Sequence, residues 1–421
     1  MNIETCVLIT YYWPPASGPG VHRWLRLSRR WPVHQLALTV CIPDKAAYPS
    51  LDKELLESVP EHIQTIQVRI TEPGQFLGFR TGVAFTSNYK KSIFSKFLAW
   101  VRGNLFLPDA RILWVNQVVK KLKKEYLSGH FKYLITTGPP HSVHLAGLKL
   151  KKIFPDITWV ADFRDPWLEV DYLKHLHLTP LALKIHRIQE SQVLTNADAI
   201  VTISDGISSI LRKKTAKPVY VIPNGIDSSL FDDLSKSHCP IRFNILHAGN
   251  MPAERDVPEL WITLKNLDKP IYVDLVGHVD NAIIQSIRMA GIPHLITVKP
   301  PVSHKESLKL QNDSALLLVV ANRTPHSKGI LTGKIYEYLA SGRPLLAIGE
   351  PGGDLEKLVK KFNAGWFIPY QDIHSCQKAL EQAYTMWKEG KLESRTINLK
   401  EFDSGYLAQR FVEVLKTSSS H

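Results

Sequence analysis

Short apolar runs alternate with longer helical patterns along almost the entire chain. Each run is rich in β-branched residues and bounded by turn residues, which is typical of buried strands. The runs are CVLITYYW, ALTVCI, YLITTG, ITWVADF, AIVTIS, VYVIPNG, FNILHAGN, YVDLVGH, LITVKP, ALLLVVAN and PLLAIG. Strands that alternate with helices predict parallel sheets, and one parallel sheet with this many strands is unusual. We therefore predict an α/β fold with two Rossmann-like, doubly wound domains that face a cleft.

The border between the predicted domains is marked by the segment KKTAKPVYVIPNGIDSSLF, which is basic, contains proline and carries an Asn-Gly turn. We expect the first domain at residues 1–217 and the second at residues 218–395. Apolar residues recur with helical spacing near the C-terminus, at Tyr406, Leu407, Phe411 and Val414. Residues 396–421 are therefore predicted to form a helix that crosses back onto the first domain.

Composition narrows the class of protein. The 421 residues are 44% hydrophobic and 22% charged, which is ordinary for a globular protein. The sequence contains no run of about eighteen uncharged apolar residues, so we expect no membrane span.

Glu4 precedes the first apolar run and no basic leader is present, so this run is interpreted as a strand. The four cysteines form no CxxC pair, which favours a cytoplasmic location and neither a zinc site nor disulfides.

The formal net charge of +13 predicts anionic partners, such as nucleic acid, anionic lipid head groups or phosphorylated small molecules. The lysines and arginines are dispersed and no nucleic-acid-binding motif is present, so we do not expect nucleic acid as a partner.

Basic and aromatic residues are interleaved in residues 88–117. They are Lys90, Lys91, Phe94, Lys96, Phe97, Trp100, Arg102, Phe106 and Trp114. This pattern is typical of an amphipathic segment at a membrane interface, where basic residues add attraction to anionic lipids. An aromatic face that packs on the sheet explains the same pattern, and both interpretations stay open.

Glycines, histidines and charged residues follow three predicted strands of the first domain. They are Gly18, Gly20, His22, Arg23, His141, His144, Asp162, Arg164 and Asp165. Open α/β sheets bind ligands at the carboxyl ends of their strands, so these positions suit a ligand. Turn glycines and helix-start histidines without a ligand are the alternative. Charged residues at the end of a buried strand need a partner, so we expect Asp162 and Arg164 to pair with each other, with Asp165 or with substrate.

The two glycines of the first loop also match the start of a dinucleotide fingerprint. Arg23 stands at the third glycine position, however, and no acidic residue follows at the expected distance. A Rossmann dehydrogenase therefore has little support.

The second domain carries the residues expected to bind a phosphorylated ligand. They are Gly249, Asn250, Arg255, Gly329, Ile330, Leu331, Thr332, Gly333, Lys334 and Glu337. A glycine-containing loop leads into a helix near Lys334, so free backbone N–H groups and an ammonium converge where a phosphate would lie. Lys334 and Glu337 share a helix face, which places a cation for a diphosphate beside a carboxylate for ribose hydroxyls. The alternative is that Lys334 and Glu337 form only an exposed ion pair and bind no ligand.

At these residues the sequence resembles the GT-B glycosyltransferases of family 4, particularly bacterial enzymes of surface-polysaccharide synthesis. The resemblance covers nearly the whole chain. It rests on YYWPPASGPGVHRW, PPHSVHLAG, ADFRDPW, ADAIVTIS, VIPNGID and KIYEYLASGRPLLAI. It implies that the first domain binds a glycan acceptor and the second a nucleotide sugar. Transfer then occurs with retention of configuration, without a cofactor or an obligatory metal.

The resemblance also implies roles for single residues. Glu337 occupies the second position of the family's Glu-x7-Glu pattern and meets the ribose, while Gly329 occupies the first position in place of glutamate. In place of that glutamate, we expect the backbone from Gly329 to Thr332 to hold the hydroxyls of the donor sugar. Arg255 and Lys334 are the expected catalytic cations for the departing diphosphate. Arg164 aligns with a histidine of the family, so its role is electrostatic.

The expected partners are a nucleotide sugar, a glycan or lipid-linked glycan acceptor and the anionic inner face of the plasma membrane. Two alternatives stay open: a sugar-nucleotide epimerase of the same fold, which needs no acceptor, and a catalytically silent protein that binds glycan or nucleotide.

Overall fold

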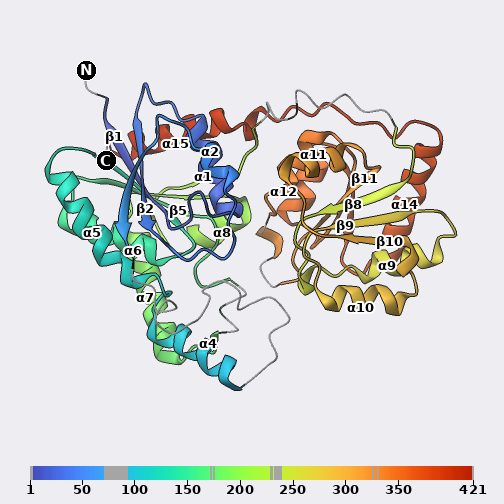
Figure 1. The fold of residues 1–421 in the computed structure, drawn as a ribbon, viewed down its shortest axis with the longest axis horizontal. Helices are drawn as coiled ribbons and strands as arrows, with labels where there is room; N and C mark the ends of the chain where they lie inside the picture. Colours follow the sequence, from blue (N-terminus) through green and yellow to red (C-terminus); the bar gives the residue numbers. More distant parts are fainter. Residues whose placement is uncertain are drawn as a thin grey trace. The chain divides into compact units, whose positions relative to one another are not determined.

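The computed structural model describes residues 3–70, 93–170, 173, 176–227, 231, 239–324, 327–329 and 331–419. The chain forms two compact units (Figure 1). The first unit comprises Met1–Gly225 and Glu401–His421, and the second comprises Ile226–Lys400.

The first unit is built on a parallel sheet in the order β3-β2-β1-β4-β5-β6-β7. Its strands are β1 (Thr5–Ile9), β2 (Ala37–Asp44), β3 (Gln64–Arg69), β4 (Tyr133–Gly138), β5 (Thr158–Phe163), β6 (Ala199–Thr202) and β7 (Val219–Val221). Alternate residues of β1 enter different hydrophobic clusters, Val7 on one side and Leu8 on the other. The sheet is therefore covered on both faces, which explains why its central strands are apolar throughout.

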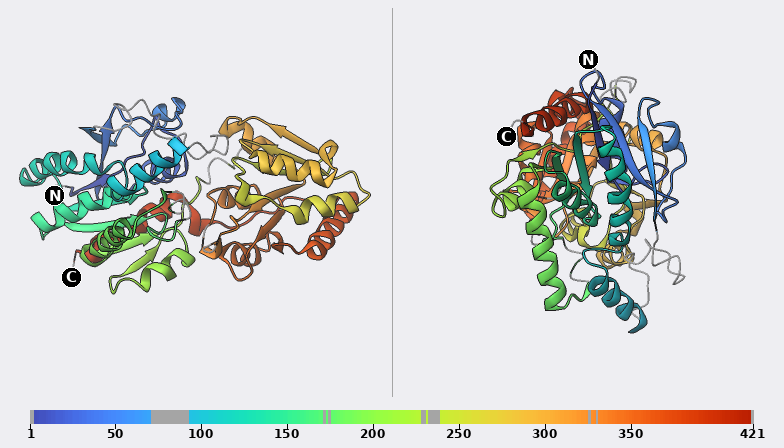
Figure 2. Two further views of the ribbon diagram at one scale, coloured as in Figure 1. Left: turned by 90° about the horizontal axis from the view of Figure 1, so that it is seen from below. Right: turned by 90° about the vertical axis from the view of Figure 1, so that its left-hand side faces the viewer.

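The helices of the first unit alternate with these strands (Figure 2). They are α1 (Pro19–Arg29), α2 (Glu54–Glu57), α4 (Ile93–Leu105), α5 (Ile112–Leu127), α6 (Ser142–Ile153), α7 (Pro180–Asn196), α8 (Asp205–Arg212) and, from the C-terminus, α15 (Ser404–Ser418). The ring of Phe411 in α15 lies 5.0 Å from that of Trp24 in α1. The C-terminal helix therefore crosses back onto the first unit, as predicted. Tyr406 was expected on its apolar face but is 45% exposed.

The second unit is built on a parallel sheet in the order β10-β9-β8-β11-β12-β13. Its strands are β8 (Asn244–Ala248), β9 (Tyr272–Val276), β10 (Ile296–Lys299), β11 (Leu316–Val320), β12 (Leu345–Gly349) and β13 (Gly365–Pro369). Its α-helices are α9 (Pro258–Asn266), α10 (Asn281–Ala290), α11 (His304–Asn312), α12 (Lys334–Ser341), α13 (Asp354–Lys361) and α14 (Ile373–Lys388). Short 3₁₀ helices are η3 (Ala253–Arg255), η4 (Pro293–Leu295), η5 (Ser327–Gly329) and η6 (Lys400–Phe402). These two parallel sheets confirm the predicted α/β class.

The first unit extends to Gly225, beyond the expected border at residue 217. The reason is β7, which pairs with β6 through Val219 opposite Ile200. The Asn-Gly turn of the border segment therefore lies at the end of the first unit.

The basic and aromatic segment 88–117 is divided between two helices. Trp114 of α5 is 1% exposed and donates its indole N–H to the carbonyl oxygen of Val68, so it packs in the core. Phe97 and Trp100 of α4 are 57% and 39% exposed, and their rings stack at 6.4 Å. Lys90 and Lys91 lie outside the described residues. No helix in the described part of the chain is long and apolar enough to cross a membrane.

Candidate functional site

The loop after β8 approaches α12 closely in the second unit. Gly249 has a φ of 119°, which suits glycine, and the ammonium of Lys334 occupies the position where a side chain on Gly249 would lie. The hydroxyl oxygen of Tyr338 in α12 accepts a hydrogen bond of 2.8 Å from the backbone N–H of Ala248. The end of β8 and the start of α12 are therefore fixed to each other.

Arg255 of η3 connects the same loop to the segment that follows β11. Its Nε donates to Oδ1 of Asn322 at 2.7 Å, and its Nη1 donates to the carbonyl oxygen of Asn250 at 3.2 Å. Both acceptors are neutral, and no carboxylate of the described residues forms an ion pair with Arg255. Burial lowers the pKa of this guanidinium. Arg255 is therefore a positioned cation with capacity left for an anion.

Lys334 is the second such cation. Its ammonium has no hydrogen bond or ion pair with any of the described residues. The pKa of Lys334 is lowered to about 8: burial is the main cause, the charge of Arg255 acts in the same direction, and the charge of Glu337 opposes both. The charge of Arg255 disfavours the ammonium of Lys334, so an anion bound between them would favour its protonated form.

The charge of Glu337 acts on Lys334, with which it was predicted to share a helix face, although no ion pair forms between the two side chains. Oε1 of Glu337 lies 3.4 Å from Nε2 of His304, the first residue of α11. We did not predict His304 as a site residue. A sequence signal for the start of this helix was present, because Ser303 and Glu306 match a capping box after the loop that follows β10.

The loop before α12 lies between η5 and the helix. Gly329 is buried, whereas Leu331, Thr332 and Gly333 are partly exposed, and Ile330 lies outside the described residues. The carbonyl oxygen of Thr332 accepts the backbone N–H of Ile335 at 3.1 Å, which begins the helix.

A hollow of about 540 Å³ lies at the same edge of the sheet. It is lined by Arg323, Thr324, Glu350, Pro351, Pro369, Tyr370 and Gln371. The hydroxyl of Tyr370 donates to the carbonyl oxygen of Asn322 at 3.0 Å, so the wall of this hollow and the partner of Arg255 belong to one network.

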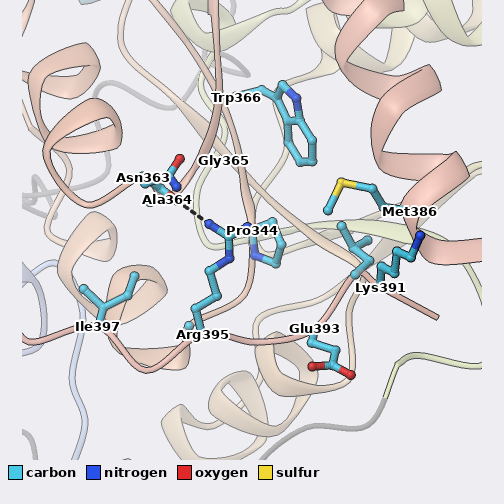
Figure 3. Close-up of a pocket in the computed structure, with 12 residues that line it drawn as sticks. Pro344, Asn363, Ala364, Gly365, Trp366, Met386, Lys391, Glu393, Arg395 and Ile397 are labelled. Atoms are coloured by element: carbon cyan, nitrogen blue, oxygen red, sulfur yellow. Dashed lines mark hydrogen bonds between the residues drawn. The ribbon is translucent and has the colours of Figure 1, made fainter. Parts of the chain in front are cut away.

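A second pocket, of about 180 Å³, lies at the opposite edge of this sheet (Figure 3). Pro344 and Ala364, which directly precede β12 and β13, line it, and Nη1 of Arg395 donates to the carbonyl oxygen of Asn363 at 3.3 Å. Because Lys334 and Arg255 lie at the carboxyl ends of the strands, this pocket is separate from the pair of cations.

In the first unit, Asp162 at the end of β5 organises a buried network. Its carboxylate accepts hydrogen bonds from Nη2 of Arg23 at 3.0 Å, from the indole of Trp24 at 3.1 Å and from the hydroxyl of Thr137 at 2.8 Å. Arg23 also donates to the carbonyl oxygen of Pro223 at 2.6 Å. Asp162 therefore pairs with Arg23 rather than with Arg164.

His141 and His144 lie side by side as their spacing predicted, with ring centroids 5.9 Å apart. Both are buried, and burial lowers their pKa values, that of His141 to about 3. Their rings stack on Trp167 and Phe163, respectively. Two neutral, stacked imidazoles support the interpretation that they shape the end of the sheet.

Gly18 has a φ of 124° and precedes α1, and His22 is partly exposed in the first turn of that helix.

Among the described residues, no group of three His, Cys, Asp or Glu side chains is arranged to hold a metal ion. The chemistry of the two candidate regions is that of arginine, lysine and backbone N–H groups, which suit phosphates.

The depressed pKa of Lys334 predicts pH-dependent binding of a diphosphate. The free site loses the ammonium proton as the pH rises through about 8, and a bound anion favours the protonated form. The Kd for a nucleoside diphosphate should therefore rise by up to about tenfold per pH unit above that value. Calorimetric titration between about pH 7 and 9 measures this, with Lys334→Arg as the control, because arginine stays charged. A Kd that rises equally in both proteins would contradict the assignment.

No family model and no curated protein matches the sequence. The structure is similar to sucrose-phosphate synthase from Thermosynechococcus elongatus, with 14% sequence identity, a TM-score of 0.65 and coverage of 98% of both chains. It is also similar to HepE from Anabaena in complex with UDP, with 13% identity, a TM-score of 0.65 and coverage of 99% of this chain and 100% of HepE. The chain has the GT-B fold.

The GT-B fold also includes a protein described as a UDP-N-acetylglucosamine 2-epimerase from Listeria monocytogenes. Its structure is similar to that of this chain, with 11% sequence identity and a TM-score of 0.52. The similarity covers 99% of this chain and 97% of the Listeria chain. The fold alone therefore leaves both transfer and epimerisation open.

Proposed function

We propose that the protein is a glycosyltransferase that moves a sugar from a nucleoside-diphosphate sugar to a glycan acceptor. The observation that carries this proposal is the pair Lys334 and Arg255, two half-buried cations at the carboxyl ends of the strands in the second unit. HepE from Anabaena, which has a similar structure, has been solved with UDP and with UDP-glucose. A nucleoside diphosphate supplies an anion that suits the two cations.

The proposed chemistry is departure of the diphosphate from the anomeric carbon, followed by attack of an acceptor hydroxyl with retention of configuration. Negative charge grows on the diphosphate as the glycosidic bond breaks. Cations held at fixed positions stabilise that charge more in the transition state than in the ground state, which lowers the barrier. Glu337, held by His304, is the proposed acceptor of ribose hydroxyl hydrogen bonds.

The proposed acceptor is a lipid-linked glycan of cell-surface polysaccharide synthesis at the inner face of the plasma membrane. The exposed, stacked rings of Phe97 and Trp100 support this, because aromatic side chains on a helix surface favour the membrane interface. They are the residues that we propose to touch lipid.

A transfer assay tests the proposal. The purified protein is incubated with UDP-, GDP-, ADP-, CMP- and dTDP-linked sugars, with and without a bacterial lipid extract, and release of free nucleotide is measured. We expect release with one nucleotide sugar, and faster release when the extract is present. Conversion of the sugar without an acceptor would instead indicate an epimerase. Binding of a nucleotide without any turnover would indicate a silent binding protein.

A further inference from the structure

The pocket at the amino ends of the strands in the second unit has a wall that is partly apolar and partly charged (Figure 3). Its volume is about 180 Å³. The apolar part of the wall is formed by Pro344, Ala364, Trp366, Met386, Leu392 and Ile397. Trp366, Met386 and Ile397 are partly exposed, so a ligand in the pocket can cover apolar surface that water contacts in the free protein.

The segment 391–397 closes one side of this pocket and is held in place by backbone hydrogen bonds. The N–H of Lys391 donates to the carbonyl oxygen of Met386 at 2.7 Å, and that of Arg395 donates to the carbonyl oxygen of Gly342 at 2.9 Å. Gly342 has a φ of 71°, and a side chain at this position would overlap the backbone of Arg395. The close approach at Gly342 therefore fixes the wall that carries Arg395.

Arg395 is a cation with unused donors in this wall. Its Nη1 donates to the carbonyl oxygen of Asn363 at 3.3 Å, which fixes the direction of the guanidinium (Figure 3). This acceptor is neutral, and no carboxylate in the described part of the chain forms an ion pair with Arg395. The side chain is exposed, so it stays charged and a ligand can reach it. A guanidinium carries five N–H donors in a planar fork, which matches the geometry of a carboxylate.

The other charged residues of the wall do not cancel this charge. Lys391 is paired with Glu389, with 2.8 Å between Nζ and Oε2. Glu393 is exposed, and Figure 3 shows its carboxylate turned away from the guanidinium of Arg395. The pocket therefore combines an apolar wall with one available cation.

We propose that this pocket binds a small molecule that joins an apolar ring to a carboxylate. The ring lies against Trp366 and Met386, and the carboxylate accepts hydrogen bonds from Arg395. Pockets for drug-sized ligands measure about 300–1,000 Å³, so a volume of about 180 Å³ suits a single ring with one acidic group. The inference goes beyond the proposed function, because this pocket lies at the opposite edge of the sheet from Lys334 and Arg255.

Such a ligand also acts on the connection between the two units. The segment 391–397 continues to Lys400, the last residue of the second unit, and Glu401 returns the chain to the first unit. A ligand held by both Arg395 and the end of the sheet restrains this segment. Its backbone amide hydrogens should then exchange more slowly with solvent.

Ligand-observed NMR with benzoate and the full-length protein tests the proposal. We expect benzoate to bind, and benzamide, which lacks the charge, to bind about tenfold more weakly. Acetate, which lacks the ring, should also bind more weakly than benzoate. Arg395→Gln should weaken benzoate binding by about tenfold, because hydrogen bonds to a charged group are lost, and Arg395→Lys should restore part of the affinity. Trp366→Ala should weaken it by about threefold or more, because the ring loses its aromatic contact.

Arg288→Gln is the matched control, because Arg288 is an exposed arginine of the same unit that does not line this pocket. It should leave the Kd for benzoate unchanged. Hydrogen exchange gives a second measurement. Benzoate should slow exchange in the segment 391–397 of the unmodified protein and of Arg288→Gln, but not of Arg395→Gln.

Absence of benzoate binding, or binding that Arg395→Gln leaves unchanged, would overturn the proposal. Binding that is lost in Lys334→Ala would also overturn it, because the ligand would then occupy the pair of cations at the other edge of the sheet. An increase in Tm with UDP that is the same in Arg395→Gln and in the unmodified protein shows that the variant is folded. A missing UDP effect in the unmodified protein would count against the transferase function and not against this pocket.

Discussion

Lys334→Ala should lower kcat of sugar transfer by about 10²–10³ while leaving the fold intact. The ammonium of Lys334 lies over Gly249 and has no partner among the described residues, so its removal leaves no buried acceptor unsatisfied. The loss falls on the transition state, where charge on the leaving diphosphate is largest. Steady-state kinetics with the accepted nucleotide sugar measures the effect.

Lys360→Ala is the matched control, because Lys360 is also a lysine of the second unit but is 72% exposed and pairs with Glu356 on the surface of α13. It should keep normal turnover. Near-normal kcat for Lys334→Ala would remove Lys334 from the mechanism and leave Arg255 without its proposed partner.

Asp162→Ala should lower the free energy of unfolding of the first unit by about 3–5 kcal/mol. Arg23 is 1% exposed, and its ion pair with Asp162 is fully buried. Without the carboxylate the guanidinium stays buried and uncompensated, and the Trp24 and Thr137 donors lose their acceptor. Urea unfolding followed by tryptophan fluorescence measures the loss.

Glu4→Ala serves as the comparison, because Glu4 belongs to the same unit and pairs with Lys132 at 3.4 Å while both side chains are about half exposed. Solvent screens such a pair, so a much smaller loss is expected. Equal losses in the two variants would show that the buried network does not hold β5 to α1.

The apolar runs predicted the central strands of both sheets and missed one edge strand in each. In β3, Gln64–Arg69, only Val68 is buried, since one side of an edge strand lies open to solvent. In β13, Gly365–Pro369, only Ile368 is buried. β3 lacks the continuous apolar run of a buried parallel strand, and the run in β13 is only the three residues Trp366, Phe367 and Ile368, so periodicity did not distinguish either strand from a loop.

The candidate residues were predictable as groups but not as pairs. The rule that ligands bind at the carboxyl ends of strands placed Arg164, Asp162 and Arg23 together. Their pairing depended on the packing of α1 against β5, which brings together residues far apart in sequence. The pairing of Glu337 with His304 has the same cause, because α11 and α12 meet only in the folded unit.

The most direct test of the central claim is thermal unfolding of the purified protein with UDP, GDP, ADP, CMP and dTDP. A ligand at about 100 times its Kd should stabilise the fold by about 2.7 kcal/mol. We predict that one nucleoside diphosphate raises Tm selectively, and that the shift disappears in Lys334→Ala and in Glu337→Ala but not in Lys360→Ala. No shift with any nucleotide, or a shift that survives in Lys334→Ala, would contradict the proposal that the second unit binds the donor through these residues.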